Sequence, residues 1–118
     1  MKPYVSICIP VFKTEELLEE ALQSVLQNDV EHVSKNVEVI IVNDGSTSTN
    51  LQGLSCKQIV KKFKKNTKIK INYIEHSQNM GLVEARRSAV YAAKGEYIFL
   101  FDSDDVLTPN CIKDLMIF

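Results

Sequence analysis

Three carboxylates lie within the four residues Asp102-Ser103-Asp104-Asp105, directly after an apolar run. Carboxylates this close repel one another, and the arrangement is costly unless a cation balances their charge. Hard oxygen ligands suit Mg²⁺ or Mn²⁺, and Mg²⁺ commonly combines one or two protein carboxylates with phosphates and water. A turn that caps a following helix would explain one of these acids but hardly three. We therefore expect this segment to hold a divalent metal against a phosphate group.

Four apolar runs that predict strands lead to this segment, at residues 4–9, 37–42, 69–74 and 97–101. The second and fourth are nearly continuous in apolar and β-branched or aromatic residues, which is typical of strands buried on both faces. The third alternates with Lys70 and Asn72, so we expect it nearer an edge of the sheet.

Helical patterns separate these runs. Apolar residues at helical spacing predict three helices. The first follows the N-cap candidate Thr14, the second contains Ile59, Val60 and Phe63, and the third covers 82–93. Gly95 is expected to take a left-handed conformation at the end of the third helix. Strands that alternate with helices imply right-handed crossovers and parallel pairing. We predict one α/β domain over residues 1–118, with a Rossmann-like, mostly parallel sheet of about four strands and helices on both faces.

Polar residues follow every predicted strand, and ligands of open α/β sheets bind beyond the carboxyl ends of the strands. Asp44 follows the second strand in an Asp-Gly-Ser turn, and its expected position beside the acidic segment favours a functional role. Arg86 and Arg87 lie near the start of the third helix, where one could meet a phosphate or a base carbonyl and the other is expected to be a surface residue. His76 has no partner at metal-ligand spacing and is interpreted as an ordinary loop histidine.

Bulk properties exclude several classes. The net charge is -1, which gives no indication of nucleic-acid binding, and the lysines from Lys57 to Lys70 are expected to form a solvated helix face. The three cysteines lack CxxC spacing, so a disulfide framework or zinc site is not expected. No stretch approaches the roughly 20 apolar residues that span a bilayer, and we expect a cytoplasmic location, with membrane association left open for a longer form. Phosphate-binding motifs of the GxGxxG and GxxxxGK[ST] types are absent.

The chain resembles the N-terminal half of family 2 glycosyltransferases, which have the A-type glycosyltransferase fold. The resemblance rests on VSICIPVFK, VEVIIVNDGST, NMGLVEARRSAVYAAKGEYIFLFDSDD and the following LTPN, which together span nearly the whole chain. It implies transfer of a sugar, with inversion, from a nucleoside diphosphate donor of the UDP type to a hydroxyl of a carbohydrate or lipid-linked acceptor. It also implies that the general base lies beyond Phe118, so residues 1–118 alone should bind donor but transfer sugar poorly.

The resemblance assigns roles to individual residues. Pro10, Val11 and Phe12 would line the nucleotide pocket, Asp44 would contact the base, and Arg86 matches the arginine of the family's ARN segment. In the DxD motif, Asp104 would reach the metal, Asp102 would lie near the ribose as a secondary ligand, Ser103 would contact the nucleotide, and Asp105 would lie behind the metal or near the donor sugar. Four positions depart from the family pattern, namely Phe12, Lys13, Asn43 and Arg87.

Two alternatives remain beside this hypothesis. The departures from the family pattern leave room for a non-catalytic interaction or regulatory module that keeps the fold and pairs with another chain, which leaves a homo-oligomer open. A receiver-like phosphoacceptor domain also has acids at strand ends, but its acidic pair should follow the first strand, where this sequence has Pro10 and Lys13.

Overall fold

The computed structural model describes residues 5–26 and 36–101. Strands and helices alternate along the chain as predicted. The elements are β1 (Val5–Val11), α1 (Glu15–Leu26), β2 (Val37–Asn43), α3 (Cys56–Lys64), β3 (Lys70–Glu75), α4 (Leu82–Ala92) and β4 (Tyr97–Leu100).

The strands form one parallel sheet in the order β3-β2-β1-β4. The central strands β1 and β2 are buried along their whole length, and β3 lies at one edge as its alternating pattern predicts. The expectation for the fourth strand is wrong. β4 lies at the other edge, with Tyr97, Ile98 and Leu100 exposed. Ile98 and Leu100 are on the face of α4, which packs on β1 and β2 rather than over β4.

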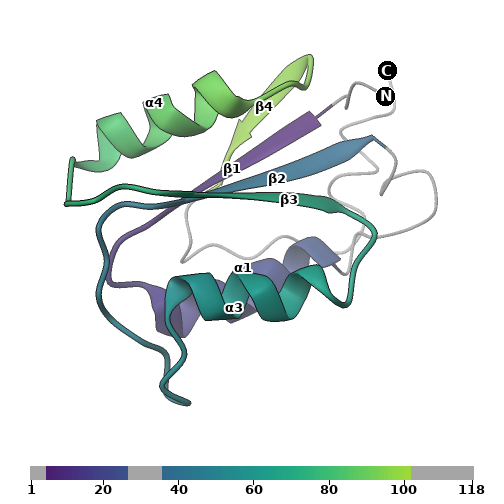
Figure 1. The fold of residues 1–118 in the computed structure, drawn as a ribbon. Coiled ribbons are helices and arrows are strands. Elements are labelled where there is room, and N and C mark those ends of the chain that lie inside the picture. The colour runs from purple at the N-terminus through teal and green to yellow at the C-terminus, as the bar shows by residue number, and fades with distance from the viewer. Residues whose placement is uncertain (1–4, 27–35, 102–118) are drawn as a thin grey trace.

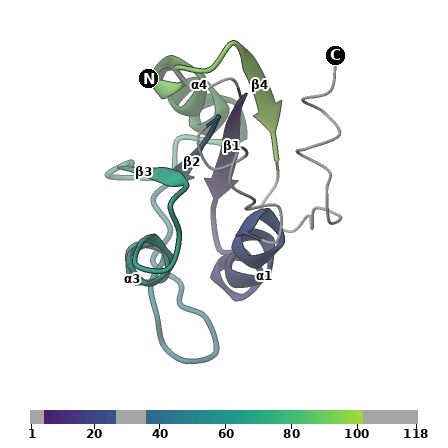
Figure 2. The same ribbon diagram turned by 90° about the vertical axis from the view of Figure 1, so that its right-hand side faces the viewer.

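Helices cover both faces of the sheet, as predicted (Figures 1 and 2). Because strand side chains alternate between faces, odd-numbered residues such as Ile7 and Ile41 pack toward α1 and α3, whereas Cys8 and Ile40 face Ala85 and other residues of α4. The first layer is the main hydrophobic core. Within residues 5–26 and 36–101, no helix is long and apolar enough to cross a bilayer.

The end of α4 is fixed by a close approach to the sheet and not by a left-handed glycine. The described glycines with positive φ are Gly45, Gly53 and Gly81, so the prediction for Gly95 is wrong. A Cβ on Gly95 would lie 2.6 Å from Oγ of Ser6 on β1. The N–H of Gly95 donates to Ser6 Oγ (2.9 Å), and the N–H of Lys94 donates to the buried carboxylate of Glu38 on β2 (2.7 Å). These contacts fasten the C-terminal end of α4 to both central strands.

The helix α3 presents its lysines to solvent, as expected from the sequence. Its apolar side chains Ile59, Val60 and Phe63 are buried, whereas the lysines of the helix are exposed. A capping box that the sequence analysis missed starts the helix: Ser55 Oγ accepts from the N–H of Gln58, and the Gln58 side chain accepts from the N–H of Ser55.

Candidate functional site

The carboxyl ends of β1, β2 and β3 meet at one rim of the sheet. Val11 pairs with Asn43 and Asn43 with Glu75, so the three strands end at the same level. Backbone bonds continue past the strands, from Asp44 N to Val11 O and from His76 N to Asn43 O, both 2.9 Å. The loops after these strands leave on the same side in Figure 1. This confirms the predicted gathering for three strands, while the segment 102–105 lies outside the described residues.

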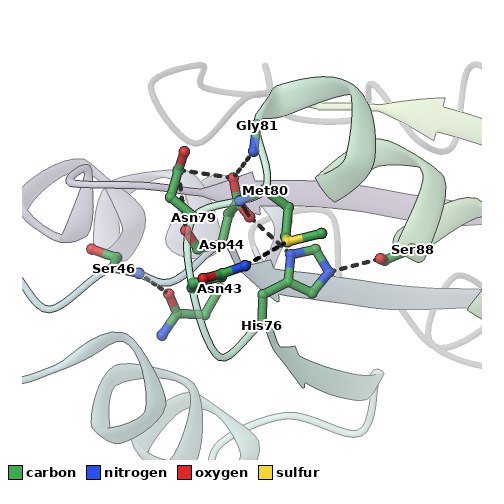
Figure 3. Close-up of polar contacts among 9 residues, drawn as sticks. Asn43, Asp44, Ser46, His76, Asn79, Met80, Gly81 and Ser88 are labelled. Carbon is green, nitrogen blue, oxygen red and sulfur yellow. Dashed lines mark hydrogen bonds and ion pairs between the residues drawn. The ribbon is translucent and has the colours of Figure 1, made fainter.

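Asp44 is the hub of this rim (Figure 3). Its Oδ1 lies 2.8 Å from His76 Nδ1 and accepts from the N–H of Met80 at 2.8 Å. Its Oδ2 accepts from Asn79 Nδ2 and from the N–H of Gly81, both at 3.0 Å. The side chain is only 3% exposed. Since an ionised carboxylate has about four acceptor sites, these contacts use its hydrogen-bonding capacity in full.

The Asp44 carboxylate also caps α4 from another part of the chain. Gly81 is the N-cap of this helix and makes no side-chain capping bond. Asp44 accepts from the N–H of Gly81 and from the N–H of Met80 before it, which places a negative charge near the positive end of the helix. Burial by itself raises the pKa of the Asp44 carboxyl. The hydrogen bonds from His76, Met80 and Gly81 outweigh it, and the resulting pKa lies below its usual value. Asp44 is therefore held in the ionised form.

Gly45 lets the two loops pack backbone against backbone. Its φ is +72°, and a Cβ there would lie 2.4 Å from both Asn79 N and the carbonyl carbon of Gln78. Only glycine fits such a space without moving the main chain. The turn after β2 thus fixes the loop 76–81 through Asp44 and through direct contact at Gly45.

The end of β1 contributes an exposed aromatic ring to the rim. Pro10 and Val11 are buried in the strand, whereas Phe12 is 40% exposed. Lys13 has a left-handed backbone (φ 59°), and its ammonium lies 5.2 Å from the centre of the Phe12 ring, within cation–π range. Of the three residues predicted to line a nucleotide pocket, Phe12 is therefore the one whose side chain is accessible.

A second polar group joins β1, β2 and α1. The N–H of Lys13 donates to Ser46 Oγ (3.0 Å), and the Ser46 hydroxyl donates to the carboxylate of Glu15, which is 1% exposed (2.7 and 2.8 Å). The Asn43 side-chain oxygen accepts from Ser46 N at 2.8 Å, which shapes the Asp-Gly-Ser turn. The helix after Thr14 was predicted, but the burial of Glu15 and its bond to Ser46 were not.

The two arginines of α4 differ in their surroundings. Arg87 is exposed and lies 3.8 Å from Glu84, one helical turn away, so it fits the predicted surface residue. Arg86 is half-buried on the helix that Asp44 caps. Whether Asp44 and Arg86 contact a nucleotide stays a prediction at this point.

His76 is the residue whose role the sequence analysis missed. Its Nδ1 meets Asp44 and its Nε2 lies 2.7 Å from Ser88 Oγ on α4, and its side chain is 15% exposed. No local sequence pattern predicts these partners, because Asp44 and Ser88 belong to other elements of the fold. Within the described part of the chain, no three His, Cys, Asp or Glu side chains are arranged to hold a metal. The metal prediction therefore rests on the segment 102–105 alone.

The contact at Gly45 can be tested against a matched glycine. Gly53 has a similar φ of +78° but would meet nothing within 4 Å as alanine. We expect Gly53→Ala to cost about 1–2 kcal/mol of unfolding free energy through backbone strain alone. Gly45→Ala should cost at least about 2 kcal/mol more, because the loop 76–81 must move. Urea denaturation of both variants measures the difference, and equal losses would contradict the close approach.

The charge on Asp44 predicts a pH-dependent stability. Because the pKa of Asp44 is lower in the folded state than its usual value of 3.8, the ionised side chain contributes stability above about pH 4 and loses it as the pH falls through the folded-state pKa. We expect Asp44→Asn to be about 2–3 kcal/mol less stable at pH 7, since an amide cannot accept all four bonds. The gap from wild type should narrow below pH 4 in urea titrations, with the exposed Glu16→Gln as control. A gap that stays constant down to pH 2 would refute this role.

Comparison with known proteins agrees with this arrangement. The model of the family "Glycosyl transferase family 2" matches residues 6–117. A putative colanic acid biosynthesis glycosyl transferase, WcaA of Escherichia coli, is 35% identical over 108 residues, covering 92% of this chain and 35% of that protein. The glycosyltransferase GlyG of Streptococcus pneumoniae is 29% identical over 115 residues, covering 98% and 35%.

A solved structure extends the comparison to the fold. The Staphylococcus aureus protein TarS, residues 1–349, in complex with UDP, superimposes with a TM-score of 0.81 at 27% identity, covering 95% of this chain and 30% of that one. TarS, a poly(ribitol-phosphate) beta-N-acetylglucosaminyltransferase, has also been solved with UDP-GlcNAc. The chain thus spans about a third of the length of these relatives and matches the N-terminal half of the A-type glycosyltransferase fold of TarS. The four-stranded sheet, the polar rim and the family match together show that the chain belongs to glycosyl transferase family 2.

Proposed function

We propose that this chain is the donor-binding half of an inverting glycosyltransferase and binds a nucleoside diphosphate sugar of the UDP type at the rim formed by β1, β2 and α4. The observation that carries the proposal is the convergence of Phe12, the turn at Asp44 and the helix with Arg86 at one end of the sheet. The similarity to TarS, which was solved in complex with UDP, supports a nucleotide of this type as the ligand.

Each residue at the rim can serve nucleotide binding in a different way. The exposed ring of Phe12 offers a flat apolar surface on which a base can stack. Arg86 offers a guanidinium, which suits a phosphate or a base carbonyl. The Asp44 carboxylate contributes by holding the loop 76–81 and the start of α4 in place, and any direct contact to the base would have to share an oxygen with its present partners. Pro10 and Val11 are buried at the end of β1, directly before Phe12, and we propose that they support it from the strand.

The metal part of the proposal concerns Mg²⁺ or Mn²⁺ near Asp102, Ser103, Asp104 and Asp105. β4 runs parallel to β1 up to Leu100, two residues before Asp102, which supports a place near the rim. Asp104 is the proposed main ligand, with Asp102 secondary and Asp105 near the donor sugar. A bound metal would stabilise, as a Lewis acid, the negative charge on the departing nucleoside diphosphate.

The transfer itself requires a base that removes the proton of the acceptor hydroxyl. We place this base in sequence beyond Phe118, and with it the contacts to a carbohydrate or lipid-linked acceptor. The task of residues 1–118 in the reaction is then to bind and orient the donor. A role in polysaccharide synthesis is consistent with the description of the Escherichia coli relative, which names colanic acid biosynthesis. The cytoplasmic location is part of the proposal.

A second candidate function is a non-catalytic module that docks another chain. The exposed apolar side chains Ile98 and Leu100 lie on one face of the edge strand β4, are 43% and 49% exposed, and favour a docking surface there. This function predicts that Leu100→Glu abolishes assembly and that Asp104→Ala does not, as measured by size-exclusion chromatography. Loss of nucleotide binding on changing Asp104→Ala supports the first.

Calorimetric titration of UDP in the presence of Mn²⁺ or of EDTA tests the donor-binding proposal. We expect removal of the metal to weaken UDP binding at least about tenfold, or about 1.4 kcal/mol, because the diphosphate loses its counter-charge. Asp104→Ala should bind UDP with the weak affinity of the metal-free protein in both conditions.

Glu20→Ala, an exposed acid on α1, is the matched control and should bind as the wild type does. UDP binding that is equally strong in EDTA would refute the metal site. A folded protein that does not bind UDP at all would refute the nucleotide site.

A further inference from the structure

His76 bridges three elements that meet at the rim (Figure 3). It directly follows β3, its Nδ1 meets Asp44 after β2 at 2.8 Å, and its Nε2 meets Ser88 on α4 at 2.7 Å. Both ring nitrogens are therefore occupied within the protein. A histidine whose two ring nitrogens both have partners has a fixed ring orientation. It therefore holds the two partners at a fixed position relative to each other.

The bridge does not depend on the charge of the imidazole. An ionised Asp44 can only accept, so Nδ1 carries the hydrogen in this contact. The Ser88 hydroxyl can then donate to a neutral Nε2 or accept from a protonated one. His76 and Ser88 also border an open pocket, whose other lining residues include the acids Glu75 and Glu84. The contact thus persists in either state, which indicates a geometric role.

Ser88, His76 and Asp44 are connected in the order of a Ser-His-Asp hydrolase triad, but their surroundings do not fit nucleophilic catalysis. An oxyanion hole needs N–H groups directed at the reacting oxygen. The N–H of Ser88 lies within α4 and belongs to its hydrogen-bond ladder. The N–H groups of Met80 and Gly81 already donate to Asp44. The remaining function of the bridge is to position the elements that it joins.

We propose that His76 is a positioning residue that, through Ser88, fixes the rotation of α4 and so directs Arg86 toward the nucleotide. Arg86 and Ser88 are two residues apart, which separates them by about 200° around the helix axis. The bond to His76 on the side of β3 therefore turns Arg86 to the opposite side of α4. Ala85 and Ala89, which face the sheet, have small side chains that resist rotation only weakly. This inference rests on the proposed nucleotide-binding role of Arg86.

Three variants change the contact between His76 and Ser88 and leave the contact between residue 76 and Asp44 in place. His76→Asn places an amide nitrogen near the position of Nδ1, so it can keep Asp44 but cannot reach Ser88. Ser88→Ala removes the same contact from the other side, and Ser88→Thr keeps the hydroxyl. We expect His76→Asn and Ser88→Ala each to weaken UDP binding about tenfold in Mn²⁺, and Ser88→Thr to restore most of it. Ser77→Ala, on the same loop and exposed, is the matched control.

The double variant His76→Asn/Ser88→Ala shows whether the two residues act as one unit. We expect it to bind UDP no more weakly than either single variant, because the contact can be lost only once. Thermal unfolding of each variant runs in parallel. A purely structural bridge would lower the melting temperature and leave the UDP affinity of the folded protein unchanged, which would overturn the inference.

The outcomes for this inference and for the proposed function differ. If the wild-type protein binds UDP and the variants bind it equally well, only the role of His76 is overturned. Losses that add in the double variant would likewise contradict a shared contact. Wild-type protein that is folded and does not bind UDP would overturn the nucleotide site, and the positioning role with it.

Discussion

The burial of one carboxylate, that of Asp44, is the constraint around which the rim is built. Placing an isolated charge in a site that is 3% exposed would cost several kcal/mol. The cost is offset by two backbone N–H groups, an amide and an imidazole, and by the positive end of α4. Satisfying this charge requires the loop after β3 to fold back over the end of β2. The position of α4 then follows from the position of that loop.

Other features of the rim are consequences of this contact. Gly45 is needed because the folded-back loop approaches the main chain too closely for a Cβ. Ser46, next in sequence, joins the same turn to Lys13 and to Glu15 of α1. At the far end of α4, Glu38 and Ser6 hold the backbone of Lys94 and Gly95. The helix is thus fixed to the central strands at both ends, which gives a preformed surface that need not be ordered on binding.

Much of the fold follows from local pattern, and most of the site does not. Periodic apolar residues predict the strands, the helices and the rim, because each element must bury one face or both. The side-chain partners of Asp44 were not predictable, since His76 and Asn79 lie more than 30 residues away in sequence and no repeat or spacing links them to it. Ser88, the other partner of His76, lies 12 residues away on a separate element. The apolar composition of β4 indicated a buried strand, yet the strand lies at an edge of the described sheet. Gly95 was assigned to a local turn, whereas its requirement comes from contact with Ser6.

The central claim is that the rim organised by Asp44 binds the nucleotide of a sugar donor, and mapping of backbone amide NMR shifts on addition of UDP and Mg²⁺ tests it most directly. The account predicts that the largest changes fall at Phe12, Ser46 and the first two turns of α4, including Arg86. It predicts no comparable change in α3, which lies under the sheet on the side opposite α4. Saturable changes confined to α3 or to β4, with the rim unaffected, would contradict it.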